Sequence, residues 1–341
     1  MSLWNQVIGH EWAVELLSGA ITHERVGHAY LITGPDQIGK TTLARTFAQA
    51  LNCQHEIVAE RPCGTCRSCK LIGQDKHLDV KIVTPEVSGR GKMSLKIDQI
   101  RALQQDLNLS AYEGRYKVAI LKRFDTATEG AANAFLKTLE EPPNNVILLL
   151  TAKDPDTIMA TINSRCRNIG LRPLSTNLIE SSLQSRWHID GAQSELLAHL
   201  ADGRLGWAVN ASKDNTILTE RDTHLEALYE AIAHNRVKRF DIADKLSRKA
   251  EDLPYVLETW LSWWRDLNIL AQNTQGKQIT LSDVISNIDQ REKLQTYAHS
   301  WTVEQALASL KQTNLALWQL QRNANTRLAL ENLLLTYPLP Q

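Results

Sequence analysis

Hydrophobic and polar positions alternate in two different ways along the first 170 residues of the chain. Short continuous apolar runs, at 28–34, 79–85, 117–122 and 145–151, have the length and the aliphatic content of strands that are buried on both faces. Between them, apolar residues recur at the spacing of amphipathic helices. Since parallel strands need such helical crossovers, the pattern predicts an α/β domain with a parallel sheet.

The pattern changes at Arg172 and Pro173. From there to about Lys213 it predicts small helices that are separated by glycines. Beyond Thr216 it predicts long amphipathic helices and almost no strand. The chain is therefore expected to have three domains, at 1–170, 171–213 and 214–341, of which the last is all-helical.

Three tryptophans, Trp260, Trp263 and Trp264, recur on one face of the helix expected at 253–270. Such a cluster could form a ligand site. Aromatic residues at this spacing more often anchor a core or a subunit interface, so we expect packing rather than ligand binding.

Charge and composition narrow the function classes. Lys+Arg and Asp+Glu both number 38, so any contact with nucleic acid is expected to be local or shared with partners. The sequence has no apolar run of 18 residues, and its N-terminus is amphipathic without a charged region and cleavage site. These features predict a cytoplasmic protein without a membrane span.

A complete phosphate-binding motif, Gly34-x4-Gly39-Lys40-Thr41, directly follows the strand expected from Ala29 to Thr33. It opens a helix expected at 41–51, which is the context that a P-loop requires. The glycines permit a tight turn in which backbone N–H groups point at phosphate oxygens near the helix N-terminus. The motif predicts a site for ATP or ADP, formed by Gly34, Pro35, Gln37, Gly39, Lys40, Thr41 and Thr42.

The residues that hydrolysis would require are absent from the end of the strand expected at 117–122. A P-loop enzyme needs acids there to organise Mg²⁺ and to orient the attacking water, but this chain has Lys122 and Arg123. The ammonium of Lys122 could occupy part of the place of the metal but cannot ligate it. Asp125 is the one acid close by. We therefore predict nucleotide binding without hydrolysis, and the sequence leaves the presence of Mg²⁺ open.

Four cysteines lie in an insertion at about 53–69, between the first helix of this domain and its second strand. Four thiolates satisfy a tetrahedral Zn²⁺ and leave no position for water, so a site of this kind is structural. His55 and His77 are possible substitutes, and Cys166 is expected to be a separate buried thiol. The predicted zinc ligands are Cys53, Cys63, Cys66 and Cys69.

Several segments together resemble the clamp-loader ATPase family, within the AAA+ class of P-loop proteins. They are the stretches 7–17 and 28–44, the cysteine cluster, NAFLKTLEEPP at 133–143, and Ser164-Arg165-Cys166. The resemblance implies a RecA-like AAA+ domain, a small helical lid domain and an all-α collar domain. It is strong over the first 170 residues and continues to 322–335, which is similar to the C-terminal helix of the family.

Within this family the choice lies between the active gamma/tau-type ATPase and the delta-prime type of the bacterial DNA polymerase III clamp loader. The acid pair of active members falls on Lys122 and Arg123. Their lid arginine, in the pattern G-x-x-R-x-A, falls on Gly206. Both losses favour the delta-prime type, and the alternative is an active ATPase that uses Asp125 or another acid. The position of Thr151 matches the phosphate-sensing region of the family.

The resemblance also implies roles outside this chain. In the family, the arginine at the position of Arg165 reaches the nucleotide of the neighbouring subunit, where an arginine finger is worth about 10³ to 10⁵ in rate. The implied partners are gamma/tau and delta types in a five-subunit ring, and through it the sliding clamp and primer-template DNA. The helix around 97–101, with Lys92 and Lys96, resembles the segment that faces the DNA backbone.

Such a chain would be a component of a DNA-directed DNA polymerase holoenzyme without catalysis of its own. Two other readings stay open on the sequence: a zinc-bearing regulatory ATPase unrelated to replication, and a purely structural collar protein.

Overall fold

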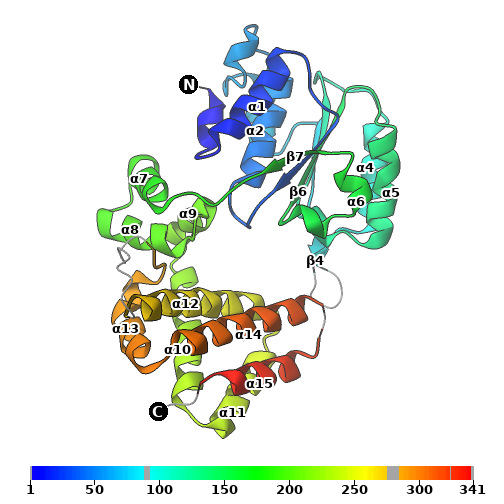
Figure 1. Cartoon of the computed structure of the whole chain (residues 1–341). Helices are drawn as coiled ribbons and strands as arrows, with labels where there is room; N and C mark the ends of the chain where they lie inside the picture. The colour runs from blue at the N-terminus through cyan, green and yellow to red at the C-terminus, as the bar shows by residue number, and fades with distance from the viewer. Residues whose placement is uncertain (1, 88–92, 275–283, 323, 339–341) are drawn as a thin grey trace. The chain divides into compact units, whose positions relative to one another are not determined.

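The computed structural model describes residues 2–87, 93–274, 284–322 and 324–338 (Figure 1). Contacts group the chain into two compact units. One comprises Met1–Leu174 with Arg204–Gly206, and the other comprises Ser175–Gly203 with Trp207–Gln341. The predicted boundary between a lid domain and a collar domain is not tested by this grouping and stays a prediction.

The first unit contains a five-stranded parallel sheet with the order β2-β5-β6-β1-β7. All four strands expected from the apolar runs are present, so the predicted α/β class is confirmed. The strands are β1 (Ala29–Thr33), β2 (Val80–Val83), β5 (Lys117–Leu121), β6 (Val146–Ala152) and β7 (Arg167–Gly170).

The register brings three strand ends to one edge of this sheet. Thr33 of β1 pairs with Ala152 of β6, and Leu121 of β5 pairs with Leu150 of β6. Because all three strands are parallel, the residues that follow them gather at the same edge. This edge carries the phosphate loop and the residues from 122 and from 153 onward.

Strand β7 was not predicted from the sequence. Ile169 is its one buried residue, and the other three are exposed, because β7 is an edge strand that pairs with β1 alone. A four-residue segment with a single buried apolar side chain gives too little pattern to be recognised.

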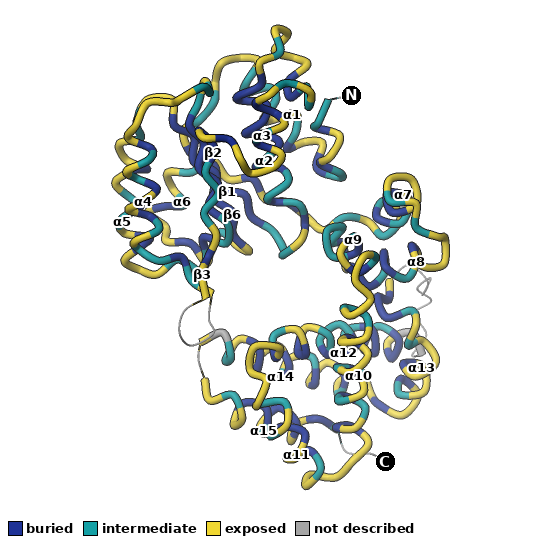
Figure 2. Tube along the Cα trace, turned by 180° about the vertical axis from the view of Figure 1, so that it is seen from behind, coloured by how far each residue is buried: buried dark blue, intermediate teal, exposed yellow. Residues whose placement is uncertain are grey.

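Helices cover both faces of the sheet. Tyr30 and Ile32 of β1 face the side covered by α1 (Glu11–Thr22) and α2 (Lys40–Asn52), whereas Leu31 faces the other side. The side that Leu31 faces is covered by α4 (Ile97–Leu107) and α5 (Glu129–Glu140), and the three central strands β1, β5 and β6 are buried along their whole length (Figure 2). The remaining elements of this unit are α3 (Arg67–Gly73), α6 (Ala160–Asn163), the two-stranded ribbon of β3 (Glu86–Val87) and β4 (Met93–Ser94), and the 3-10 helices η1 (Leu3–Gln6), η2 (Val58–Glu60), η3 (Phe124–Thr126) and η4 (Pro155–Thr157).

The second unit is helical, as the pattern after Arg172 predicts. Within the part of the chain that the structure describes, none of its helices, nor any of the first unit, is long and apolar enough to cross a membrane. Its helices are α7 (Thr176–Trp187), α8 (Gly191–Leu200), α9 (Leu205–Lys213, whose first two residues group with the first unit), α10 (Thr216–Ala233), α11 (Arg236–Ser247), α12 (Leu253–Thr274), α13 (Arg291–Ser300), α14 (Val303–Gln321) and α15 (Thr326–Thr336), with the 3-10 helix η6 (Ile288–Gln290) before α13.

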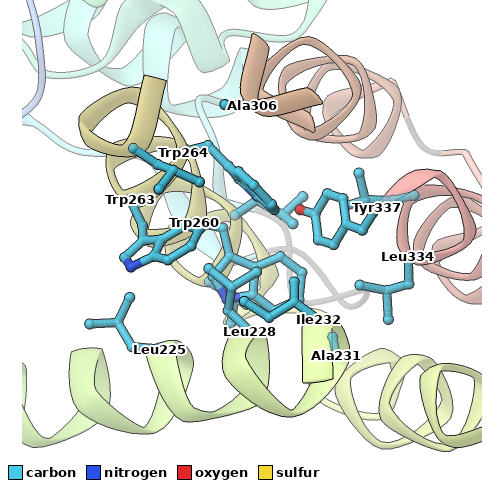
Figure 3. Packing of buried hydrophobic residues seen from close by; sticks show 14 of the residues in the cluster. Leu225, Leu228, Ala231, Ile232, Trp260, Trp263, Trp264, Ala306, Leu334 and Tyr337 are labelled. Atoms are coloured by element: carbon cyan, nitrogen blue, oxygen red, sulfur yellow. The ribbon is translucent and has the colours of Figure 1, made fainter. Parts of the chain in front are cut away.

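The tryptophans of α12 form the centre of the core of this unit (Figure 3). Trp260, Trp263 and Trp264 are fully buried. The ring of Trp264 lies 5.0 Å from that of Tyr337, and the indole N–H of Trp260 donates to the carbonyl of His224 at 2.7 Å. The expectation that these residues serve packing is confirmed.

Candidate nucleotide and metal sites

The phosphate loop connects β1 to α2, and its two motif glycines adopt backbone conformations that require glycine. Gly34 has φ +139°, and a Cβ added to it would lie 2.6 Å from the carbonyl oxygen of Leu171. Gly39, at φ +114°, caps α2. Such turns leave N–H groups at a helix N-terminus, where phosphate oxygens bind. The predicted loop residues therefore lie together in the loop and the first turn of α2.

The ammonium of Lys40 is held inside this loop. Its Nζ donates to the carbonyl oxygens of Gly34 at 2.5 Å and of Pro35 at 2.7 Å, and the residue is 7% exposed. Burial is the main cause that lowers the pKa of Lys40, and the carboxylates of Asp36 and Asp125 oppose that effect. The charge of Lys40 is thus already directed at the place where phosphates would bind.

A second lysine, which the sequence analysis did not assign to the site, reaches the same loop. Lys153 follows β6, and its Nζ lies 2.9 Å from Asp36, whose other oxygen lies 3.8 Å from Lys40. The carbonyl of Lys153 also accepts a bond from Gly34 N–H at 3.1 Å. Although burial raises the pKa of Asp36, the neighbouring cations, with Lys153 first, bring it below its usual value.

At the end of β5, the backbones of Lys122 and Arg123, which replace the acid pair, bond to different neighbouring strands. The backbone N–H of Lys122 donates to Val83 at 2.9 Å, on the side of β2. Arg123 has φ +50°, and its N–H donates to the hydroxyl of Thr151 at 3.0 Å, on the side of β6. Its guanidinium Nη1 donates to the sulfur of Met93 on β4 at 3.6 Å, and its charge lowers the pKa values of both Asp36 and Lys40.

Two polar atoms near this strand end are buried without a partner among the described residues. They are the Nε of Arg123 and the Oδ1 of Asp125, which lies on η3. A buried donor or acceptor without a partner is costly in free energy, so each of these two atoms calls for a partner such as a ligand. Asp125 also raises the pKa of Lys40, which places its carboxylate near the same loop.

The position of the family's lid arginine is occupied by backbone. The N–H of Gly206 donates to the carbonyl oxygen of Gln37 at 2.9 Å, and a Cβ at this position would lie 2.5 Å from that oxygen. No side chain fits there without moving the phosphate loop. The loss of the arginine is therefore accompanied by a direct backbone contact to the loop.

Arg165 follows α6 and is partly exposed. Its Nη2 lies 2.9 Å from a carboxylate oxygen of Glu140 on α5, and its Nη1 donates to the carbonyl of Thr161 at 2.8 Å. Its side chain is 38% exposed, and that of Glu140 is 51% exposed. The guanidinium thus lies at the surface in an ion pair that solvent weakens.

The four cysteines of the insertion converge. Their Sγ atoms all lie within 4.8 Å of one another, and the backbone N–H groups of residues 63, 66 and 69 point at the sulfurs of residues 53, 63 and 66 at 3.4 to 3.5 Å. Burial raises the pKa of Cys63, but the hydroxyl of Thr65 and backbone N–H groups lower it to about 6. N–H donors to sulfur favour the thiolate, which is the form that binds metal. This donor set fits a closed, structural Zn²⁺ site.

The other predicted metal and thiol candidates lie elsewhere. The Nε2 of His55 lies 3.3 Å from Glu60, and the Nδ1 of His77 accepts from Asp79 N–H, so neither histidine is needed as a ligand. Cys166 is only partly buried, which corrects the expectation of a buried thiol, although burial still raises its pKa to about 12.

The helix suggested for DNA contact is present as α4, but its cations are engaged in ion pairs. Lys96 lies 3.6 Å from Glu86, and Arg101 lies 3.9 Å from Asp98. Lys92 lies outside the described residues. Contact with DNA at this helix stays a prediction.

Residues 9–175 match the model of the family described as "DNA polymerase III, delta subunit". The DNA polymerase III subunit tau of Bacillus subtilis is 33% identical over 205 residues, which are 59% of this chain and 35% of that protein. The delta' subunit of the same organism is 27% identical over 273 residues, 80% of this chain and 76% of that protein.

This chain thus spans about a third of the length of the tau relative. Among solved structures, a DNA polymerase III gamma subunit-related protein of Thermotoga maritima aligns over 95% of this chain and 97% of its own, with 16% identity and a TM-score of 0.46, too low to bear on function. The family match and the two relatives agree with the motifs quoted above, and the chain belongs to the clamp-loader family of DNA polymerase III subunits.

Proposed function

We propose that this chain is a delta-prime-type clamp-loader subunit, which binds ATP or ADP without hydrolysing it and supplies Arg165 to a neighbouring ATPase subunit. Its partners are gamma/tau and delta types in a five-subunit ring that loads the sliding clamp on primer-template DNA in the cytoplasm. The helices of 214–341 join the collar of that ring, and Zn²⁺ on the four cysteines stabilises the insertion.

One observation carries this proposal: an intact phosphate loop lies beside a strand end that carries cations. Hydrolysis requires a residue that ligates Mg²⁺ and one that orients water. Lys122 and Arg123 can do neither. The backbone of Gly206, packed against Gln37, supplies no lid arginine to a bound phosphate.

The role of Arg165 is tested in a ring reconstituted with gamma/tau-type and delta-type subunits, clamp and primer-template DNA. Arg165→Ala is expected to lower ATP turnover by about 10³ to 10⁵ at the one site that this residue serves, and total turnover by the share of that site. An unchanged rate at every site would leave the chain a structural role alone.

A matched control is Arg115→Ala. Arg115 is exposed and precedes β5, at the opposite edge of the sheet from the phosphate loop, so turnover should stay at the level of the unaltered ring. Since the Arg165–Glu140 pair is exposed, Arg165→Ala should change the free energy of unfolding by less than about 1 kcal/mol. A loss of turnover then reflects the guanidinium and not folding.

The alternative is an active gamma/tau-type ATPase. The observation that favours it is the Oδ1 of Asp125, which is buried without a partner in the described part of the chain and whose carboxylate raises the pKa of Lys40. Phosphate release by the purified chain alone separates the two functions. Turnover at the rate of the family's motor subunits, abolished by Lys40→Ala, supports the active type; background turnover supports the delta-prime type.

A further inference from the structure

The phosphate loop is surrounded by more cations than a magnesium-dependent site needs. Lys40 lies inside the loop, Lys153 lies 2.9 Å from Asp36 on its outer side, and Arg123 acts on both from the end of β5. Two carboxylates, of Asp36 and Asp125, oppose these three cations. The net local charge is positive before any metal ion is added.

Magnesium does not fit the residues that would have to hold it. Mg²⁺ takes octahedral oxygen ligands, in P-loop proteins the Ser/Thr hydroxyl and an acid at the neighbouring strand end. Thr41 supplies the hydroxyl, but the strand end supplies Lys122 and Arg123. Asp125, on η3, is a single carboxylate, and the positive charges of Lys40 and Arg123, which act on the same place, would repel the ion.

The Arg123 side chain has an unused donor suited to phosphate. Its Nε is buried and has no acceptor in the part of the chain that the structure describes, whereas its Nη1 donates to the sulfur of Met93 at 3.6 Å. Its backbone, at φ +50°, donates to the hydroxyl of Thr151. A phosphate oxygen is the acceptor that guanidinium groups recognise best.

We infer that this loop binds the polyphosphate of a nucleotide without a divalent cation, and that Arg123 and Lys153 supply the positive charge that Mg²⁺ supplies in active members of the family. The inference rests on the nucleotide-binding part of the proposed function and goes beyond it. It assigns ligand-binding roles to Arg123 and Lys153 and names the ligand as a metal-free nucleoside di- or triphosphate.

The first test is calorimetric titration of the full chain with ADP and with ATPγS, in Mg²⁺ and in EDTA. Mg²⁺ adds two positive charges to the nucleotide, so its complex is attracted less to a cationic site. We expect equal or tighter binding in EDTA. Binding that is weaker in EDTA overturns the inference while nucleotide binding itself stands; no binding in either buffer defeats that part of the proposed function as well.

Since EDTA also competes for the zinc of the insertion, zinc content is measured after each titration, and the Mg²⁺-free arm is repeated in a buffer without added metal. Agreement of the two Mg²⁺-free arms shows that the result does not come from loss of zinc. If the two Mg²⁺-free titrations differ, the one in which the protein retains its zinc is compared with the titration in Mg²⁺.

Charge-removing variants identify the residues. Arg123→Gln and Lys153→Gln are each expected to weaken Mg²⁺-free binding about tenfold, the loss of one charge-assisted hydrogen bond. Arg115→Gln, at the other edge of the sheet, should leave affinity unchanged. Unchanged affinity in both site variants, with unaltered thermal unfolding, would contradict the assignment.

Asp125→Asn distinguishes a metal ligand from a neighbouring repulsive charge. If Asp125 only opposes the phosphates, its neutralisation tightens Mg²⁺-free binding. If Asp125 ligates Mg²⁺, the unaltered chain binds nucleotide more tightly in Mg²⁺ than in EDTA, and Asp125→Asn removes that difference. This result would show that the inference is wrong.

Discussion

Gly206 is a single residue at which the proposed loss of ATP hydrolysis has a structural counterpart. Its N–H donates to Gln37, and its Cα lies so close to the phosphate loop that a Cβ would meet the carbonyl oxygen at 2.5 Å. Restoring the family's arginine at this position would therefore displace the loop rather than add a phosphate contact. The glycine and the cationic strand end are two separate departures from an active site, and they agree.

We predict that Gly206→Ala lowers the free energy of unfolding of the chain by about 1 to 3 kcal/mol, because the methyl group forces the backbone of Gln37 to move. Urea denaturation measures this change. Gly191→Ala is the matched control: a Cβ there meets nothing within 4 Å, so stability should be unchanged or rise by up to about 1 kcal/mol. Equal effects of the two substitutions would show that the loop tolerates a side chain at 206.

Residues at the site differ in how far the sequence could predict them. The motif itself predicts Lys40 and the loop glycines, since their roles depend on neighbours along the chain. The ion pair of Asp36 with Lys153 joins residues more than a hundred positions apart and depends on the register of β1 against β6. Nothing in either local sequence indicates that contact.

At the scale of elements, we expect the cysteine insertion to depend on a metal ion more than on packing. Its only regular elements are short ones, η2 and α3, and Cys63 and Cys66 are partly exposed. Small segments with little core of their own usually need a metal or a disulfide. The spacing of the cysteines predicted the cluster: the two Cys-x2-Cys steps place the sulfurs of Cys63, Cys66 and Cys69 together through local turns, and Cys53, at the end of α2, completes the set.

We predict one Zn²⁺ per chain, measured by elemental analysis of the purified protein. Cys66→Ser should reduce the zinc content and lower the melting temperature, since the remaining thiolates no longer complete a tetrahedron. Cys166→Ser is the control and should retain the metal, because Cys166 lies outside the cluster. Full zinc occupancy in the Cys66→Ser protein would contradict a four-cysteine site.

The helix α12 carries most of the buried aromatic residues of the second unit, so substitutions on it should lower the free energy of unfolding of the chain. Trp264 is fully buried and stacks on Trp301 at 5.4 Å. Trp264→Ala should cost about 3 to 5 kcal/mol in unfolding free energy because it leaves a large cavity. Trp318, 51% exposed on α14, is the matched control, and Trp318→Ala should cost less than about 1 kcal/mol. Comparable losses in urea denaturation would mean that α12 does not organise this core.

Across the whole molecule, catalytic competence requires parts that lie in different places. An active site needs the acids at the end of β5, a phosphate contact from the lid and an arginine from a neighbouring subunit. Under the proposed function this chain lacks the first two, and Arg165 lies at the surface in a pair with Glu140. Replacing only the missing acids should therefore restore Mg²⁺-dependent nucleotide binding without restoring ATP turnover.

The double variant Lys122→Asp, Arg123→Glu tests that reasoning. The new carboxylates should make nucleotide binding tighter in Mg²⁺ than in EDTA, since they supply metal ligands and remove a cation that repels the metal. Phosphate release by the isolated chain should stay at background, because Gly206 still offers no side chain and no neighbouring subunit is present. Turnover at the rate of the family's motor subunits in this variant would mean that the strand-end cations alone keep the chain inactive, and that neither the lid nor a partner is required.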